Sequence, residues 1–237
     1  MYPPESPEVV PDRSKFAPPT GSKLIGELAT VVQLPRLAWR APALLRAPRG
    51  RAEVLVLPGY GTDDRATYPL RTALQTLGHR VSGWGLGRNR GDVEADLPAV
   101  RELSERVAAD AGRPIVMIGW SLGGVFAREV ARDRPESVSR VITYGTPVVG
   151  GPRYTRSASA YGEARVARIE ERIEERETTP IERPITAFYS RSDGVVDWRA
   201  CIDTTSPDVE NVEVRSTHIG MTIDPDVWSA IAHLLAD

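Results

Sequence analysis

The sequence predicts an α/β fold built on an open, mostly parallel sheet of about six strands, with helices on both faces. Short β-rich segments alternate along the chain with helical segments, and glycine or proline marks many of the junctions. The strand segments are nearly continuous apolar runs, which is typical of parallel strands buried on both faces. The length of 237 residues suits one domain with an additional segment.

The expected elements begin at residue 53. Runs rich in valine, isoleucine and aromatic residues place the strands at 53–58, 80–84, 114–120, 138–145, 184–190 and 212–216. Apolar residues that return every three or four positions place the helices at 64–77, 92–111, 122–134 and 225–236. The α/β domain that results covers residues 51–237, after a proline-rich tail over 1–20 that we expect to be disordered and a helical segment over 21–50.

The segment over residues 21–50 begins with an amphipathic helix. Its apolar residues are Leu24, Ile25, Leu28, Val31 and Val32, and its polar residues are Lys23, Glu27, Thr30 and Gln33. Two interpretations are open: the segment packs on the domain or a second subunit, or it rests on a membrane surface or covers an apolar site. We favour packing on protein, because amphipathic helices usually bury their apolar stripe there.

Residues 146–183 interrupt the alternation with a loop rich in glycine, proline and serine, followed by the helix EARVARIEERIEERE. The apolar stripe of this helix is narrow and consists of Val166, Ile169 and Ile173, so we expect a solvated helix that lies over the domain. An insertion between two strands of an α/β enzyme can act as a lid, but a surface excursion without a gating role fits equally well.

Composition and charge exclude several classes of function. Thirty basic and 32 acidic residues give a net charge of −2, which provides no uniform basic field for a nucleic acid. Cys201 is the only cysteine, so neither a disulfide nor a Cys/His zinc cluster is expected, and no metal or organic cofactor is implied. The first residues lack the pattern of a secretory signal, and no apolar stretch approaches the ~20 residues that span a bilayer. We expect a cytoplasmic protein, with peripheral membrane contact left open.

The pentapeptide GWSLG at 119–123 matches the pattern G-x-S-x-G. It follows an expected strand and precedes an expected helix, which is the setting of a nucleophile on a sharp strand-to-helix turn. The glycines remove side chains that would collide where strand and helix close around the serine. The helix N-terminus also favours negative charge that develops beside Ser121. These features predict Ser121 as a nucleophile.

A serine nucleophile needs a base, and the chain contains only three histidines. His79 lies between an expected helix and strand, where a turn or capping role is ordinary. His233 lies in the apolar run of the last helix, which suits a packed core residue. His218 follows the last expected strand, at the edge where the catalytic loops of a parallel sheet gather. We therefore predict His218 as the base.

The acid that orients the histidine is expected in the segment SRSDGVVDW, after the strand at 184–190. Asp193 follows that strand directly and precedes a glycine, so a tight turn directs its carboxylate to the same edge of the sheet. Asp197 is the reserve candidate, with a helix N-cap or a surface charge as its alternative role. The resulting chain order is Ser121, Asp193, His218.

The loops at this edge also supply candidates for an oxyanion hole and a substrate pocket. Leu122 and Tyr60 are expected to donate backbone N–H groups to the oxyanion, since one follows the nucleophile and the other follows the first strand. Trp120, Arg88 and Asn89 are candidate substrate-binding residues. For Arg88 and Asn89, in the segment GWGLGRN, bracing of the oxyanion loop and a purely structural turn are alternatives.

Together these motifs resemble the α/β-hydrolase superfamily, in particular its bacterial lipase-like and esterase-like members. The segments that carry the resemblance are VLPGYG, GWGLGRN, IGWSLGG, YSRSDGVVDW and VRSTHIGM. The resemblance covers most of the chain from around Leu34 and implies serine hydrolase chemistry on an ester. The chain departs from the family pattern in carrying Pro58-Gly59 where His-Gly is common, and in lacking the first antiparallel strands.

We therefore expect an esterase that forms an acyl-enzyme on Ser121 and releases the acid with water activated by His218. Apolar residues in the helical segment over 21–50 and near the insertion favour a hydrophobic or lipid-like acyl chain. The protein would then be a carboxylesterase or a lipase. An acyltransferase or thioesterase would use the same residues. A non-catalytic binding protein on a hydrolase fold is a further alternative, against which the complete set of serine, acid and histidine argues.

Overall fold

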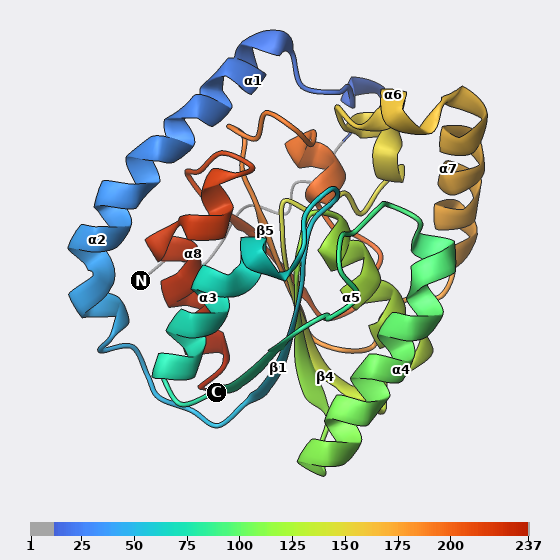
Figure 1. The fold of residues 1–237 in the computed structure, drawn as a ribbon. Helices are drawn as coiled ribbons and strands as arrows, with labels where there is room; N and C mark the ends of the chain where they lie inside the picture. Colours follow the sequence, from blue (N-terminus) through green and yellow to red (C-terminus); the bar gives the residue numbers. More distant parts are fainter. Residues whose placement is uncertain (1–11, 237) are drawn as a thin grey trace.

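A parallel sheet with the strand order β2-β1-β3-β4-β5-β6 forms the centre of the protein (Figure 1). The computed structural model describes residues 12–236. The strands are β1 (Glu53–Leu57), β2 (Arg80–Gly83), β3 (Ile115–Trp120), β4 (Val138–Tyr144), β5 (Ile185–Tyr189) and β6 (Val209–Glu213). The predicted α/β fold class, with its parallel sheet, is confirmed.

The last strand lies earlier in the chain than the sequence pattern predicts, at Val209–Glu213 instead of 212–216. β6 is one of the two edge strands of the sheet and is only half-buried. Charged residues therefore occupy it, and an apolar run does not mark its bounds. After β6, the N–H of Val214 still bonds to the carbonyl of Tyr189 at 2.8 Å. The chain then leaves the sheet and enters the loop that carries His218.

Helices cover both faces of the sheet, and each face has its own apolar core (Figure 1). Val54 and Val56 of β1 point into the core beneath α3 and α8, whereas Leu55 points into the core beneath α4 and α5. The bounds of these helices are α3 (Asp64–Thr76), α8 (Pro225–Leu234), α4 (Val93–Ala111) and α5 (Leu122–Asp133). Burial on both sides explains why the strands are continuous apolar runs.

Residues 12–44 form the short helix η1 (Arg13–Lys15) and then a run of helices, which lies along the side of the domain that carries α3 and α8 (Figure 1). The run consists of α1 (Gly21–Gly26), η2 (Glu27–Val32) and α2 (Gln33–Leu44). Of the tail expected over residues 1–20, residues 1–11 lie outside the described part. Residues 12–20 are held against the domain: Phe16 packs edge-on against Tyr154, and the Ala17 N–H donates to Asp197 at 2.9 Å.

Residues 21–45, called the N-terminal segment below, contact the domain with their polar face. We expected the apolar face to make this contact. Its polar side chains Glu27 and Gln33 are buried. Its large apolar side chains point outward, with Leu28 74% and Trp39 82% exposed, and the others of this kind are Ile25, Val31, Val32, Leu34 and Leu45. The expectation that the apolar stripe faces protein is wrong here, because the surface beneath the helix consists of polar loops that bind polar side chains. Only the far part of α2 adds apolar contacts, through Leu37 and Leu44.

The insertion between β4 and β5 lies on the side of the molecule opposite α2 (Figure 1). It contains η3 (Gly151–Tyr154), α6 (Ala158–Tyr161) and α7 (Glu163–Glu177). Val166 of α7 is buried, and Ile169 and Ile173 are half-buried with their side chains close to η3. Two short helices, η4 (Trp198–Cys201) and η5 (Gly220–Ile223), complete the loops after β5 and β6.

Candidate active site

Ser121 lies in a strained turn between β3 and α5. Its φ is 52° and its ψ is −123°, and it is the only non-glycine residue with a positive φ in the described range 12–236. Its N–H donates to the carbonyl of Tyr144 at 2.9 Å, which fixes the turn against the end of β4. A Cβ on Gly119 would collide with the backbone of Gly124. Glycine is therefore required for strand and helix to close around Ser121.

Two backbone N–H groups are available near this turn. Leu122 is the first residue of α5, so its N–H has no acceptor within the helix. Tyr60 lies in the loop after β1, and within the described chain no acceptor takes its N–H. A Cβ on Gly59 would lie 2.9 Å from the ring of Trp120, so glycine at that position lets the loop approach β3. Leu122 thus follows Ser121 directly, and Tyr60 lines the same cavity as Ser121.

His218 and Asp193 meet at the ends of the loops after β6 and β5. The Nδ1 of His218 donates to Oδ2 of Asp193 at 2.7 Å, and both side chains are buried. The other carboxylate oxygen accepts the N–H groups of Val195 at 2.8 Å and Val196 at 2.7 Å, which fixes the carboxylate in the turn. Because Nδ1 is engaged, Nε2 is the ring nitrogen left to act as a base. The ring also lies against Trp120, with 5.6 Å between centroids.

Burial and two carboxylates act in opposite directions on the pKa of His218. Burial alone lowers the pKa, because loss of water disfavours the imidazolium. The charge and hydrogen bond of Asp193, with a smaller contribution from the charge of Glu27, outweigh burial and raise the pKa above its ordinary value of 6.5. The imidazole is therefore a stronger base than an isolated one.

A cavity of about 950 Å³ opens at this edge, and Ser121 and His218 both line it. Its volume lies within the range of small-molecule sites. The lining also contains Tyr60, Trp120 and Leu122 and a set of apolar side chains from the insertion, the loop after β5 and α5, namely Val125, Val148, Ile169, Ile173, Val195 and Val196. The lining also contains charged side chains, and α7 supplies most of them. The cavity thus has both apolar and charged walls.

The predicted substrate-binding role of Arg88 and Asn89 is not supported, because neither residue lines the cavity. Asn89 is fully buried, and its side-chain amide donates to the Pro58 carbonyl at 2.9 Å. The Nε of Arg88 donates to the carbonyl of Gly61 at 2.7 Å. Both residues therefore brace the loop that carries Tyr60, which was the alternative role. Trp120, the third candidate, does line the cavity.

The remaining candidates hold structural positions. Asp197, the reserve candidate for the acid, is the N-cap of η4 and accepts the Arg199 N–H at 3.1 Å. The carboxylate that His218 binds is that of Asp193. His79 is buried and accepts the Ala52 N–H on Nδ1 at 3.2 Å, and burial lowers its pKa. His233 is exposed on α8, and the expectation of a packed core residue is wrong because it lies on the solvent face of that helix.

Glu27 is a residue of this site that the sequence did not single out. Its carboxylate accepts the N–H of His218 at 2.9 Å and that of Gly194, next to Asp193, at 2.8 Å. The only signal in the sequence is its place on the polar face of the N-terminal segment, and an isolated glutamate on such a face is usually solvated.

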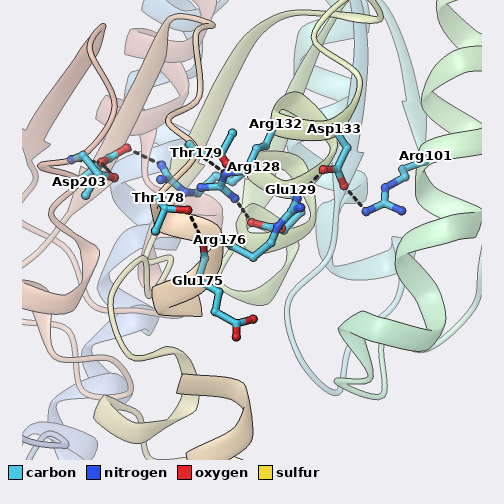
Figure 2. Close-up of polar contacts among 11 residues, drawn as sticks. Arg101, Arg128, Glu129, Arg132, Asp133, Glu175, Arg176, Thr178, Thr179 and Asp203 are labelled. Atoms are coloured by element: carbon cyan, nitrogen blue, oxygen red, sulfur yellow. Dashed lines mark hydrogen bonds and ion pairs between the residues drawn. The ribbon is translucent and has the colours of Figure 1, made fainter. Parts of the chain in front are cut away.

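Salt bridges tie α7 to the helices beneath it. Arg176 pairs with Glu129 and Asp133 of α5, and Arg101 of α4 also reaches Asp133 (Figure 2). In the same region Arg128 of α5 pairs with Asp203 at 2.8 Å, and both side chains are buried (Figure 2). Nearer the start of α7, Arg165 pairs with Asp92 and Arg172 pairs with Glu94, at exposed positions. The described residues contain no group of three His, Cys, Asp or Glu side chains arranged to hold a metal ion.

Comparisons with known proteins agree with this fold. The family model "Alpha/beta hydrolase family" matches residues 32–236. A pimeloyl-[acyl-carrier protein] methyl ester esterase of Edwardsiella ictaluri is 34% identical over 45% of this chain and 39% of its own length. An enzyme of the same name from Aliivibrio salmonicida is 28% identical over 57% of this chain and 51% of its own length. The chain thus spans about half the length, or less, of these curated relatives.

Solved structures share the fold. The monoacylglycerol lipase of Paleococcus ferrophilus has a TM-score of 0.58 at 16% identity and is matched over 79% of this chain and 96% of its own. A thioesterase domain from a curacin biosynthetic pathway has a TM-score of 0.56 at 16% identity, over 81% of this chain and 93% of its own. At these identities the likeness concerns the fold alone. The family model covers most of the sequence, and the protein belongs to the alpha/beta hydrolase family.

Proposed function

We propose that the protein hydrolyses carboxylic esters through an acyl-enzyme on Ser121, with His218 as general base and acid and Asp193 as the group that orients it. The observation that carries the proposal is the 2.7 Å bond between His218 and Asp193 beside a cavity that Ser121 also lines. A buried histidine that is hydrogen-bonded to a carboxylate and placed near a strained serine fits this chemistry.

The proposed reaction has two steps. Ser121 attacks the ester carbonyl while Nε2 of His218 takes the hydroxyl proton, and the imidazolium then gives that proton to the leaving alcohol. Water, deprotonated by His218, attacks the acyl-enzyme and releases the acid and the free serine. The N–H groups of Leu122 and Tyr60 hold the oxyanion in both steps. Asp193 keeps the imidazole in one tautomer and stabilises its charged form.

The proposed substrate is an ester with a hydrophobic acyl chain. The apolar side chains of the cavity support this choice because they line the same cavity as Ser121. The relatives named pimeloyl-[acyl-carrier protein] methyl ester esterase are consistent with an acyl ester of this kind. We therefore expect turnover to rise with acyl-chain length until the cavity is filled.

The test combines labelling with turnover. A fluorophosphonate should label Ser121, located by peptide mass, and p-nitrophenyl esters from acetate to palmitate should be cleaved. Ser121→Ala should lose both activities by about 10³-fold or more while the protein stays folded. A folded wild-type protein that is neither labelled nor active would support the non-catalytic binding protein instead. A flat chain-length profile would contradict the hydrophobic substrate, and an ester formed with an added alcohol would identify an acyltransferase.

We also propose that this protein is cytoplasmic and contacts an anionic membrane surface through the N-terminal segment. The outward apolar side chains include Trp39, a residue type favoured at membrane interfaces. Directly after the segment, Arg46 and Arg49 are exposed and have no ion-pair partner among residues 12–236, which suits anionic headgroups. In the described part of the chain, no helix is long and apolar enough to cross a bilayer.

Flotation with vesicles tests this contact. The wild-type protein should bind vesicles that contain phosphatidylglycerol, and a variant with Ile25, Leu28 and Trp39 replaced by serine should bind at least ~10-fold less. Tyr68→Ser, which removes an exposed aromatic side chain from α3, is the matched control and should bind like wild type. Equal flotation of all three proteins would contradict the proposal. A dimer that the triple variant cannot form would show that a second copy covers this face instead.

A further inference from the structure

The polar face of the N-terminal segment contacts the two loops that carry Asp193 and His218. Lys23 donates to the carbonyl of Arg191 at 2.9 Å. The hydroxyls of Thr30 and Thr217 are 2.9 Å apart, and the amide of Gln33 donates to the hydroxyl of Ser216 at 3.2 Å. One helical segment therefore bonds to both loops.

Glu27 lies at the centre of this contact. Oε1 accepts the N–H of Gly194 at 2.8 Å and that of His218 at 2.9 Å, and Oε2 accepts the N–H of Ile219 at 2.9 Å. The residue is 6% exposed, and no lysine or arginine pairs with it in the described part of the chain. Three backbone dipoles thus take the place of a counter-ion around a buried carboxylate, and bonds to a charged acceptor are among the stronger ones in proteins.

The position of these bonds matters for the site. Gly194 follows Asp193 directly, and His218 is itself a donor, so one carboxylate sets the spacing of the loops that hold the acid and the base. A Cβ on Gly194 would lie 2.9 Å from Oε1 of Glu27 and would collide with the carbonyl of Lys23. Glycine at this position is therefore matched to the presence of the segment.

We propose that Glu27 is a positioning residue for the reaction, which joins the loops of Asp193 and His218 through their backbone N–H groups and adds a second negative charge behind the imidazole. The proposal rests on the proposed function, because it concerns the same base. It links the segment that carries the outward apolar face to the geometry of the reacting groups.

Two charged groups face His218 in the described part of the chain. Asp193 faces it from the loop after β5, and Glu27 faces it from η2. β3 places the indole of Trp120 against the ring, the end of β4 places Gly145 there, and η5 contributes Met221 near the same position. Both carboxylates raise the pKa of His218, so removal of the charge of Glu27 should lower it.

The first measurement does not depend on turnover. In the Ser121→Ala background, the imidazole resonances of His218 are followed against pH by NMR, with and without Glu27→Gln. The titration midpoint should move to lower pH in Glu27→Gln. Asp64→Asn is the matched control, since the carboxylate of Asp64 also accepts two backbone N–H groups, those of Trp84 and Gly85, in a different loop. It should leave the midpoint unchanged.

The second measurement is the pH profile of ester hydrolysis. The acidic limb of kcat/KM should move to lower pH in Glu27→Gln. kcat should fall by about 10- to 100-fold, because the amide keeps one acceptor oxygen but places an NH2 donor where the second oxygen accepted an N–H. KM should change little, since Glu27 does not line the cavity. Glu27→Asp keeps the charge but shortens the reach, so it should retain an acidic limb near that of wild type while kcat still falls.

The outcomes separate the two proposals. A shifted His218 midpoint in a protein without esterase activity would support the coupling of Glu27 to His218 but would contradict the proposed function, and with it a role of Glu27 in that reaction. An active Glu27→Gln variant with the wild-type midpoint and acidic limb would overturn the role of Glu27 and leave the proposed function intact. Loss of thermal stability without movement of the midpoint, in variants that remain folded, would show a merely structural residue and would also overturn it.

Discussion

Two amphipathic helical segments flank the carboxyl edge of the sheet, and they face the protein in opposite ways. α7 turns its narrow apolar stripe inward, with Val166 buried, and most of its charged side chains are exposed. The N-terminal segment turns its polar side chains inward and its apolar side chains outward. An amphipathic pattern therefore identifies two unlike faces, but the surface beneath the helix decides which of them is buried.

The surfaces beneath the two segments explain the difference. α7 lies over the apolar part of the cavity and over η3, where apolar side chains are the better partners. The N-terminal segment lies over loops whose backbone N–H groups point outward from the ends of β5 and β6, and a buried N–H without an acceptor costs free energy. Glu27 supplies these N–H groups with acceptors, so a polar face is the stabilising one.

The comparison is tested most strongly by the same substitution on both segments. Val166→Asp, at a buried position of α7, should lower the free energy of unfolding by about 2–4 kcal/mol, because it places a charge in an apolar contact. Val31→Asp, at a position 68% exposed, should change it by less than ~0.5 kcal/mol. Urea unfolding at neutral pH measures both. A large loss in Val31→Asp would mean that the outward face is covered in solution, and equal losses would remove the contrast.

The sequence predicted the fold and the grouping of Ser121, Asp193 and His218 at one edge of the sheet better than their surroundings. Strand-to-helix turns have strict local requirements, so GWSLG at 119–123 indicated Ser121, and the chain order of Asp193 and His218 followed from the ends of the strands. The bracing role of Arg88 and Asn89 and the contacts of Glu27 depend on loops far apart in the chain. The Glu27 carboxylate reaches N–H groups 167 to 192 residues away, and no local pattern records such a pairing.

We expect a smaller change in the free energy of unfolding when the ion pairs between α7 and α5 are removed. Burial raises the pKa of Asp133, but Arg176 and Arg101 outweigh it and lower the pKa below 3.8. The stability from this carboxylate is therefore present above that value and is lost as the pH falls through the lowered pKa. Arg176→Met should lower the free energy of unfolding by about 1–2 kcal/mol at pH 7. Below pH 4, the free energy of unfolding of this variant should fall less than that of the wild type.

Arg172→Ala is the matched control for the ion pair between Arg176 and Asp133. Its partner Glu94 is exposed, and exposed ion pairs contribute less than ~1 kcal/mol to stability. Urea unfolding of both variants at pH 7 and at pH 3 makes the comparison. If Arg176→Met and Arg172→Ala lose the same small amount at pH 7, the tie to Asp133 adds nothing to the apolar stripe. α7 would then be held by Val166 and its neighbours alone, and the contrast with the N-terminal segment, which polar contacts hold, would become sharper.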